Sequence, residues 1–337
     1  MTNYIFRRLL FMIPTLFGIT LICFTLIQFV PGGPVEQYIA RVQGANAERG
    51  LSTENSLNQE EIENIRAYFG FDEPAHIRYL NWITNITKCD LGTSYFHEEP
   101  VFDVIASKFP ISLFFGLSSF FLSYLICIPL GVFKAMHAGK WLDTISSILI
   151  FIGYVIPSYA LGVLLLILFG GGSYLDLFPM QGIVSDNFED LTPFEQVLDF
   201  LHHMVLPMTC YMASQFAFLT LLMKNSIIEE IRKDYIRTAL VKGSSRTGAL
   251  FKHALRNSLI PLATGLSEIF TVMFAGSLLI EKVFDIDGMG LLFYNSIVNR
   301  DYNVVMGLIL LMSIMTLLGR LFSDILYALV DPRIRFK

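Results

Sequence analysis

Several residues in this chain are of types that could bind a metal or catalyse a reaction, but their spacing suits neither task. His202 and His203 are adjacent at the edge of an apolar block and have no Cys or carboxylate at the spacing of metal ligands, so we interpret them as interfacial histidines. Gly139 and Lys140 lack the first glycine and the final Ser or Thr of a G-x-x-x-x-G-K-[ST] phosphate loop. The sequence therefore predicts no catalytic residue, no metal site and no nucleotide site of that kind.

Glu268 is the clearest ionisable residue inside an apolar block. A charge at mid-bilayer costs roughly 2.5–3.5 kcal/mol on insertion scales, so such a residue usually faces water or protein. Two roles fit this position. Glu268 could line a translocation pathway and meet a cationic group of a substrate, or it could pair with a neighbouring helix or subunit. The sequence leaves both roles open.

A basic segment, residues 234–257, lies between two apolar blocks. It is too charged to enter a bilayer and too long and patterned to be a simple connector. A helix from Asp234 would place Tyr235, Thr238, Ala239 and Lys242 on one face, at the i, i+3, i+4 and i+7 spacing. Gly243 can end that helix in the left-handed conformation, and the serine pair 244–245 can cap a second one. The pattern fits a docking surface or an amphipathic loop at the membrane surface.

Long apolar blocks dominate the rest of the chain. Of its 337 residues, 54% are hydrophobic and 16% are charged, which excludes an ordinary soluble domain. A helix needs about 20 apolar residues to cross a bilayer. Six blocks qualify: residues 9–30, 109–133, 144–170, 204–223, 257–281 and 303–330. We therefore predict an all-α integral membrane protein with six transmembrane helices.

Positive charges are concentrated in alternate connections. The two chain ends and the connections 134–143 and 224–256 carry Arg7, Arg8, Lys134, Lys140, Lys224, Arg232, Lys233, Arg237, Lys242, Arg246, Lys252, Arg256, Arg333, Arg335 and Lys337. The connection 171–203 is acidic and has no Lys or Arg, and 31–107 is also net acidic. By the positive-inside rule, both termini are predicted to be cytoplasmic, and 31–107 and 171–203 external.

Three parts follow from this topology. Residues 1–30 form a cytoplasmic tip and the first helix, which is too long for a signal peptide and is followed by Pro31-Gly32-Gly33-Pro34 rather than a cleavage site. Residues 31–107 form an external insertion with helical patterns at 58–69 and 77–86. Residues 108–337 form the core, with the other five helices and the connection 224–256.

Four segments carry a resemblance that covers almost the whole chain. They are DYIRTA at 234–239 with Lys242-Gly243 and HALRNSLIP at 253–261, YIFRRLL at 4–10 with PGGP at 31–34, residues 284–301 with GMGL at 288–291, and residues 324–333 ending in VDPR. The first of them resembles the EAA coupling loop of bacterial ABC importer permeases, in its peptide/nickel (Dpp/Opp-type) form. GGPVEQ at 32–37, the long insertion, Gly171 to Tyr174 and DPRI at 331–334 look most like the YejB-like branch of that family.

The resemblance implies the type I permease fold of ABC importers and a place in the cytoplasmic (inner) membrane. It implies a second permease, two ATPases that bind ATP and Mg²⁺, an external solute-binding protein, and no nucleic acid. The implied cargo is a peptide, including peptide antibiotics of the microcin C type, with nickel or another small solute as the alternative. The implied contacts with the ATPase are Asp234, Tyr235, Ile236, Arg237, Thr238, Ala239, Lys242 and Gly243.

One departure from the family pattern affects the polar contact with the ATPase. Where the general pattern has Glu-Ala-Ala, this chain has Arg237-Thr238-Ala239. The acid is therefore missing, and the sequence does not show that Asp234 or Glu230 replaces it.

Overall fold

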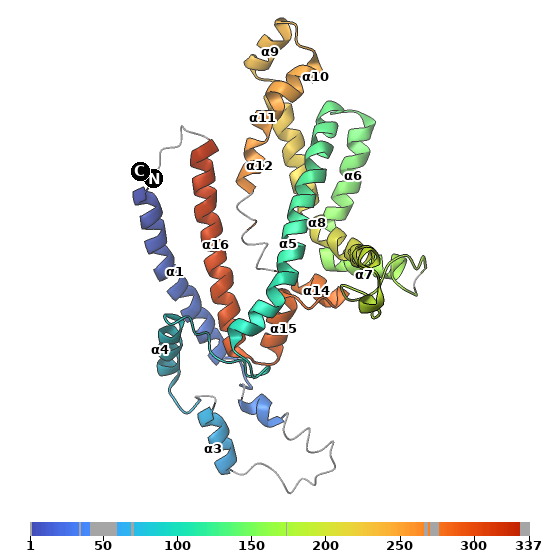
Figure 1. Cartoon of the computed structure of the whole chain (residues 1–337). Helices are drawn as coiled ribbons and strands as arrows, with labels where there is room; N and C mark the ends of the chain where they lie inside the picture. Colours follow the sequence, from blue (N-terminus) through green and yellow to red (C-terminus); the bar gives the residue numbers. More distant parts are fainter. Residues whose placement is uncertain are drawn as a thin grey trace. The chain divides into compact units, whose positions relative to one another are not determined.

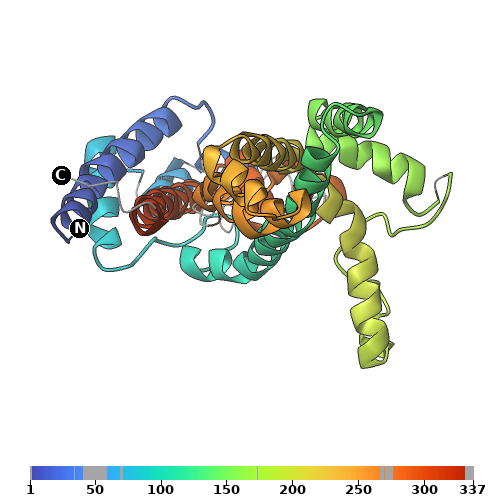
Figure 2. The same ribbon diagram turned by 90° about the horizontal axis from the view of Figure 1, so that it is seen from above.

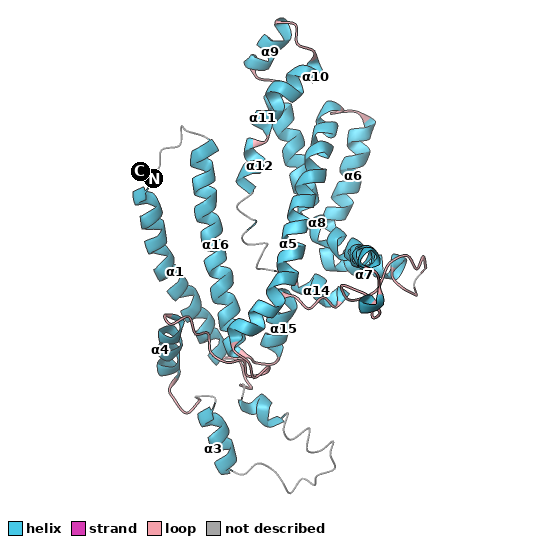
Figure 3. Ribbon diagram, in the orientation of Figure 1, coloured by secondary structure: helices cyan, strands magenta, loops and turns pink. Residues whose placement is uncertain are grey.

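A computed structural model describes residues 2–33, 35–40, 59–68, 71–172, 174–265, 269 and 276–330. Within these ranges the secondary structure is helical, with two isolated β-bridges (Figure 3). The chain forms two compact units. Unit 1 contains residues 111–291 and 318–337, and unit 2 contains residues 2–110 and 292–317.

Among the described residues, three helices are long and apolar enough to cross a membrane without a break. They are α1 (Thr2–Gln28), α5 (Val101–Met136) and α16 (Tyr302–Val330), labelled in Figure 1. At 1.5 Å per residue, the 27 residues of α1 extend roughly 40 Å, which exceeds the apolar core of a bilayer. These helices confirm the predicted first, second and sixth blocks, and α5 begins eight residues before the predicted block.

Two further predicted blocks are bent helix pairs rather than straight helices, and for the block 144–170 this corrects the prediction. Residues 144–170 fall in α6 (Trp141–Val155) and α7 (Ser158–Phe169), which meet at 102°. Pro157 explains the break, because the residue before a proline is driven out of the helical region, and Ile156 is extended with φ −76° and ψ 122°. Helix α8 (Pro193–Ile231) bends by 55° between its parts 193–213 and 215–231 (Figure 2).

The fifth predicted block is described only in part. Its described pieces are short helices: α11 (Leu255–Ser258), α12 (Ile260–Thr264) and α14 (Leu278–Phe284). Most of residues 266–275 lie outside the described residues. The three unbroken helices and the two bent pairs account for up to five spans, so the count of six stays a prediction.

The first turn of α8 shows how sequence sets a helix end. Thr192 is the N-cap, its side chain accepts from the Glu195 N–H, and the Glu195 carboxylate accepts from the Thr192 N–H at 2.9 Å. This reciprocal arrangement is a capping box, and Pro193 follows at the first helical position, where its missing N–H costs nothing.

Among the described residues, two of the clusters of buried side chains pack the long helices of unit 1 together. One joins α5, α7, α8 and α14 around Phe115, Cys210 and Phe284, and the other joins α5 and α8 to residues 250–262 around Val132 and Met223. The second cluster depends on close contact between two helices, because a Cβ atom on Gly131 would lie 2.6 Å from the Cβ of Met223. Unit 1 is thus packed along most of α8.

In unit 2, an aromatic contact joins α4 (Ala75–Ile86) to α1. Tyr79 is buried, its ring lies 5.9 Å and 5.1 Å from the rings of Phe17 and Phe24, and its hydroxyl lies 3.0 Å from Thr20 Oγ1. Since Tyr79 lies in the middle of α4, this contact fixes both the position and the rotation of the helix.

A buried carboxylate organises the loop that follows α4. Asp301, fully buried before α16, accepts from Ser94 Oγ at 2.5 Å and from the N–H groups of Tyr95 and Phe96, each at 3.1 Å. Asn303 Nδ2 donates to the Thr93 carbonyl at 2.8 Å. Residues 93–96 are therefore held against the start of α16.

Candidate functional site

The basic segment folds as two short helices joined by a tight turn, as the sequence predicts. Helix α9 (Asp234–Val241) ends at Gly243, whose φ is +91°. Gly243 N–H donates to the Leu240 carbonyl at 3.0 Å, and Ser244 N–H donates to the Ala239 carbonyl at 3.1 Å. This pair of bonds is a Schellman motif, which satisfies two carbonyls at the helix end and requires a left-handed residue.

Ser245 starts the second helix. It is the N-cap of α10 (Arg246–Ala249), and its Oγ accepts from the Gly248 N–H at 3.1 Å. The chain continues through a π-helical turn, η3 (Leu250–Ala254), into α11. The predicted hinge residue and one of the two predicted cap residues therefore have the expected conformations.

The basic segment has a small apolar interior of its own. Ile236 is 1% exposed and packs in one cluster with Ala249 and Ala254, which are also buried. Among the residues implied as ATPase contacts, Ile236 is thus an internal packing residue. Its neighbours in the segment are held by this contact and by the turn at Gly243.

The predicted docking face lies on the outside of the segment. Tyr235, Thr238 and Lys242 are exposed and Ala239 is half-buried between them. The structure adds Val241, which is 89% exposed and which the sequence reasoning did not single out. An apolar side chain this exposed beside polar ones is typical of a contact surface, although a single one is also ordinary on protein surfaces.

Glu230, at the end of α8, holds the basic segment through hydrogen bonds. Its carboxylate is buried and accepts from Lys233 Nζ and from the Tyr235 hydroxyl, and Asn257 Nδ2 donates to that hydroxyl at 3.0 Å. The hydrogen bond to Glu230 raises the pKa of Lys233, and burial together with Glu230 raises the pKa of Tyr235. Tyr235 therefore connects α8, α9 and α11 through its hydroxyl.

The two acids that could replace the missing glutamate of the family pattern differ in how accessible they are. Glu230 is already engaged by Lys233 and Tyr235. The Asp234 side chain is 96% exposed, and its one ion pair, with Arg237 Nη1 at 3.6 Å, is at the surface and contributes little. Asp234 is the acid that a partner could reach.

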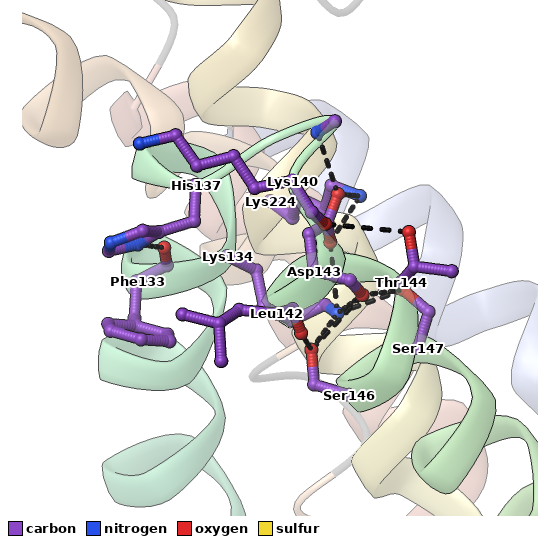
Figure 4. Close-up of polar contacts among 11 residues, drawn as sticks. Phe133, Lys134, His137, Lys140, Leu142, Asp143, Thr144, Ser146, Ser147 and Lys224 are labelled. Carbon is purple, nitrogen blue, oxygen red and sulfur yellow. Dashed lines mark hydrogen bonds and ion pairs between the residues drawn. The ribbon is translucent and has the colours of Figure 1, made fainter.

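A second polar cluster, the Asp143 cluster, lies near the connection between α5 and α6, which is at the same end of unit 1 as α9 and α10 (Figure 1), and its contacts are drawn in Figure 4. Asp143 opens α6, and its carboxylate lies 3.1 Å from Lys134 Nζ on α5 and 2.8 Å from Lys224 Nζ on α8. Lys134 is 0% exposed and also donates to Ser146 Oγ at 2.7 Å and Ser147 Oγ at 2.9 Å. Three helices meet at one carboxylate.

The Asp143 cluster and the hydrogen bonds of Glu230 both involve α8. Lys224 and Glu230 are six residues apart on that helix, which corresponds to about 9 Å along its axis. The basic segment is therefore connected to the α5–α6 corner through a single short stretch of α8.

Glu281, which the sequence reasoning missed, is the most enclosed acid among the described residues of unit 1. It is 0% exposed, and its carboxylate accepts from Ser112 Oγ at 3.2 Å, Tyr211 hydroxyl at 3.1 Å, Ser277 N–H at 3.1 Å and Leu291 N–H at 2.7 Å. All four of these donors are neutral.

Glycines surround Glu281 on two sides. A Cβ on Gly288 would lie 2.7 Å from the carboxylate, and a Cβ on Gly276, whose φ is +55°, would lie 2.5 Å from Oε1. In the sequence the site appears only as an acid with glycines at 276, 288 and 290 nearby, a pattern that does not identify it without the contacts from other helices. Glu281 joins α5, α8 and α14 by hydrogen bonds that need no cation.

The other predicted side chains have simpler outcomes. Glu268 lies outside the described residues, so its role in the pathway stays a prediction. His202 Nε2 lies 2.7 Å from the Leu177 carbonyl, and His203 Nδ1 lies 2.9 Å from the Asp199 carbonyl.

Long apolar helices, two broken helix pairs and an exposed basic segment define a multi-pass membrane protein of the transporter type. The chain belongs to the family of binding-protein-dependent transport system inner membrane components: the family model matches residues 127–336, and the model of its N-terminal region matches residues 1–116. It is therefore an inner-membrane permease by family.

Relatives match over their whole length. The chain is 42% identical to the peptidoglycan transport system permease protein YejB of Agrobacterium fabrum, over 100% of this chain and 99% of the relative. It is 40% identical to the inner membrane ABC transporter permease protein YejB of Escherichia coli O157:H7 and 32% identical to the oligopeptide transport system permease protein AppB of Bacillus subtilis, each over 100% of both chains. The two relatives named YejB match the branch of the family that the motifs indicate.

We expect Asp143→Asn to lower the free energy of unfolding by about 3 kcal/mol, because it leaves the buried Lys134 without its counter-ion. Thermal unfolding of the purified protein in detergent measures this as a lower Tm. Asp186→Asn, which removes an exposed acid of the same unit, is the control and should not change the Tm.

The double variant Asp143→Asn/Lys134→Met should recover part of the lost stability, since it also removes the unpaired buried charge. Equal Tm values for Asp143→Asn and Asp186→Asn would show that the cluster does not hold the three helices together.

We expect Tyr235→Phe to loosen the basic segment locally. The change keeps the ring but removes a hydroxyl that bridges Glu230 and Asn257, at a cost of about 1–2 kcal/mol, or roughly tenfold faster opening. Hydrogen–deuterium exchange over residues 234–258 measures this. Tyr174→Phe, at an 87% exposed tyrosine, is the control and should leave the exchange rate unchanged. An unchanged exchange rate in Tyr235→Phe would show that the hydroxyl of Tyr235 does not stabilise the basic segment.

Proposed function

We propose that this chain is one permease subunit of an ATP-driven importer of peptides. The observation that carries the proposal is the full-length match to permeases named for oligopeptide and peptidoglycan transport. Relatives named for glutathione transport, 31% identical over the full chain, are consistent with short peptides as the cargo class. These names favour a peptide over nickel or another small solute.

The proposed complex contains a second permease, two cytoplasmic ATPases and an external solute-binding protein. This chain supplies membrane helices and no phosphate-binding loop of its own, so ATP and Mg²⁺ would bind to the ATPases. Both chain ends and the basic segment would face the cytoplasm, and the segments 31–107 and 171–203 would face outward, as the distribution of Lys and Arg predicts.

In this proposal the basic segment inserts into a cleft of one ATPase. Its exposed side chains, including Asp234, Thr238, Val241 and Lys242, would make the contact, while Ile236 and the Gly243 turn keep the segment in one conformation. ATP-driven closure can move the segment only if the closed ATPase pair binds it differently from the open pair.

The motion would then reach the membrane helices along α8. Tyr235 and Glu230 connect the segment to the end of α8, and Lys224 connects α8 to Asp143 at the start of α6. Because these contacts connect α9 to α8 and α8 to α6, the basic segment and the adjoining ends of α5, α6 and α8 would move together and change which side of the membrane the pathway faces.

Uptake by the reconstituted complex tests this function. Proteoliposomes with both permeases, both ATPases and the binding protein should take up a short peptide only with ATP. Peptide uptake by the permeases without the ATPases would contradict the proposal. Nickel uptake in the absence of peptide uptake would favour the alternative cargo.

In the same assay, Ala239→Arg and Gly243→Val should separate ATP hydrolysis from uptake, with uptake reduced about tenfold or more at normal abundance. The Arg side chain would obstruct the small site on α9, and Val is disfavoured at a φ of +91°. Ala239→Ser and Gly243→Asn are the matched controls, because Ser is small and Asn tolerates the left-handed region. Normal uptake in both test variants would show that the segment does not couple the ATPases to transport.

For Glu268, we expect Glu268→Gln to reduce the uptake of cationic peptides relative to neutral ones, because it removes a negative charge from the proposed pathway. Uptake of a lysine-containing tripeptide and a neutral tripeptide of the same length measures this ratio. An unchanged ratio would assign Glu268 to contacts between helices or subunits.

A further inference from the structure

Unit 2 contains a cavity of about 720 Å³ that none of the preceding contacts explains. It lies between the end of α1, helix α4, the loop 92–95 and the start of α16. Its volume falls within the range of roughly 300–1000 Å³ that is typical of sites for small molecules. Its walls mix aromatic rings with charged groups, which distinguishes it from the apolar groove between α5, α6 and α8.

Arg78 and Trp82 supply one wall of this cavity. They are four residues apart on α4, so their side chains lie on one face of the helix. The ring of Tyr79 holds α4 against α1, and the Tyr79 and Trp82 rings are stacked with centroids 6.3 Å apart. The Arg78 guanidinium lies 4.3 Å from the centroid of the Phe71 ring, and its Nη2 donates to Gln28 Oε1 at 2.6 Å. Both side chains are therefore held in place.

Two donors on this wall lack an acceptor. Arg78 Nε and Trp82 Nε1 are both buried, and neither has a hydrogen-bond partner in the part of the chain that the structure describes. Within the same residues, Arg78 has no carboxylate within ion-pair distance, and its one hydrogen-bond partner is the neutral Gln28. Buried donors are normally paired, and a partly buried cation is stabilised most by an anion. Burial also lowers the pKa of Arg78.

The rest of the lining indicates what kind of anion fits. Tyr38, Tyr95 and Tyr302 add aromatic surface, and Glu73 and Glu98 add negative charge. Glu73 accepts from Asn81 Nδ2 at 2.8 Å. Two glutamates disfavour a purely anionic ligand such as inorganic phosphate. They favour a ligand that carries a positive group as well as a negative one, and the aromatic rings favour apolar surface on it.

We propose that this cavity binds the carboxylate terminus of a peptide, with the carboxylate accepting from Arg78 Nε and Trp82 Nε1. A peptide with free termini carries both charges and has side chains that can contact the tyrosines. The identity of the ligand rests on the proposed function of the whole chain as a peptide permease. The same carboxylate chemistry could come from an acidic side chain of the external binding protein, and the experiment distinguishes the two sources.

Trp82 is also the probe for the test. The chain has two tryptophans, and the other, Trp141, is 68% exposed at the start of α6. In the full-length Trp141→Phe protein in lipid nanodiscs, the fluorescence of Trp82 is titrated with tri-alanine and with tri-alanine amide. We expect a saturable change with the free acid and about tenfold weaker binding of the amide, because the amide loses the charge-assisted bond.

Arg78→Gln in the same background should remove the difference between acid and amide. Lys88→Gln is the control: it removes one positive charge from the exposed residue just after α4, outside the cavity, and should keep the difference. Trp82→Phe keeps a ring and loses only the indole donor. Its binding of tri-alanine, followed by calorimetry, should weaken while that of the amide does not.

A second titration uses the peptide-free binding protein. If that protein changes the Trp82 signal, tri-alanine does not, and Arg78→Gln abolishes the change, the carboxylate belongs to the binding protein. If neither ligand gives a signal that depends on Arg78, the proposal is overturned. These measurements need no ATP and no transport, so a failure of ATP-driven uptake would count against the proposed function and not against this site.

Discussion

The ion pairs around Asp143 are the constraint on which the arrangement of unit 1 depends. Its carboxylate lies within 3.1 Å of Lys134 and 2.8 Å of Lys224, and it also accepts from the Gly139 N–H at 3.2 Å. The ends of α5, α6 and α8 and the turn between α5 and α6 are therefore fixed to one group. Removal of this group would leave two nearby cations, one of them fully buried, without compensation. The proposed coupling through the basic segment would require this stiffness, because a helix end that yields would absorb the movement.

Unit 1 uses a different kind of interaction at Glu281. There, a fully buried carboxylate is held by four neutral donors, two of them main-chain N–H groups, and glycines leave room for it. Main-chain donors are fixed by the fold, so the site needs no long side chain to be ordered. Asp143 joins helix ends through two lysine side chains. Glu281 is held by the backbone at Ser277 and Leu291 and is linked to α5 and α8 by the hydroxyls of Ser112 and Tyr211. Both arrangements immobilise α5 and α8, which are the helices common to the two sites.

The sequence predicts the parts of this structure that local chemistry determines. Apolar blocks give α1, α5 and α16, Gly243 gives the left-handed turn, and Ser245 gives the second helix start, because each depends on residues close together in the chain. Features that depend on tertiary contacts are harder to predict from the sequence. The 102° break at Pro157 exceeds an ordinary proline kink. The burial of Ile236 depends on Ala249 and Ala254. The site around Glu281 is recognised only when Ser112 and Tyr211 are brought to it from other helices. Periodicity does not contain this information.

A count of charged residues in each loop does not tell which lysines are exposed, and four lysines of this chain show the difference. Lys134, Lys140, Lys224 and Lys242 contribute equally to the predicted topology, since the positive-inside rule depends on which loops are basic and not on what each side chain contacts. The structure divides them: Lys134 and Lys224 neutralise Asp143, whereas Lys140 and Lys242 are exposed. Of these four lysines, only the exposed Lys140 and Lys242 are available to a partner or to lipid headgroups. Burial therefore decides which side chains can dock. By that criterion the exposed face of α9 and its end includes Asp234, Tyr235, Arg237, Thr238, Val241 and Lys242, and the buried Ile236 packs beneath it.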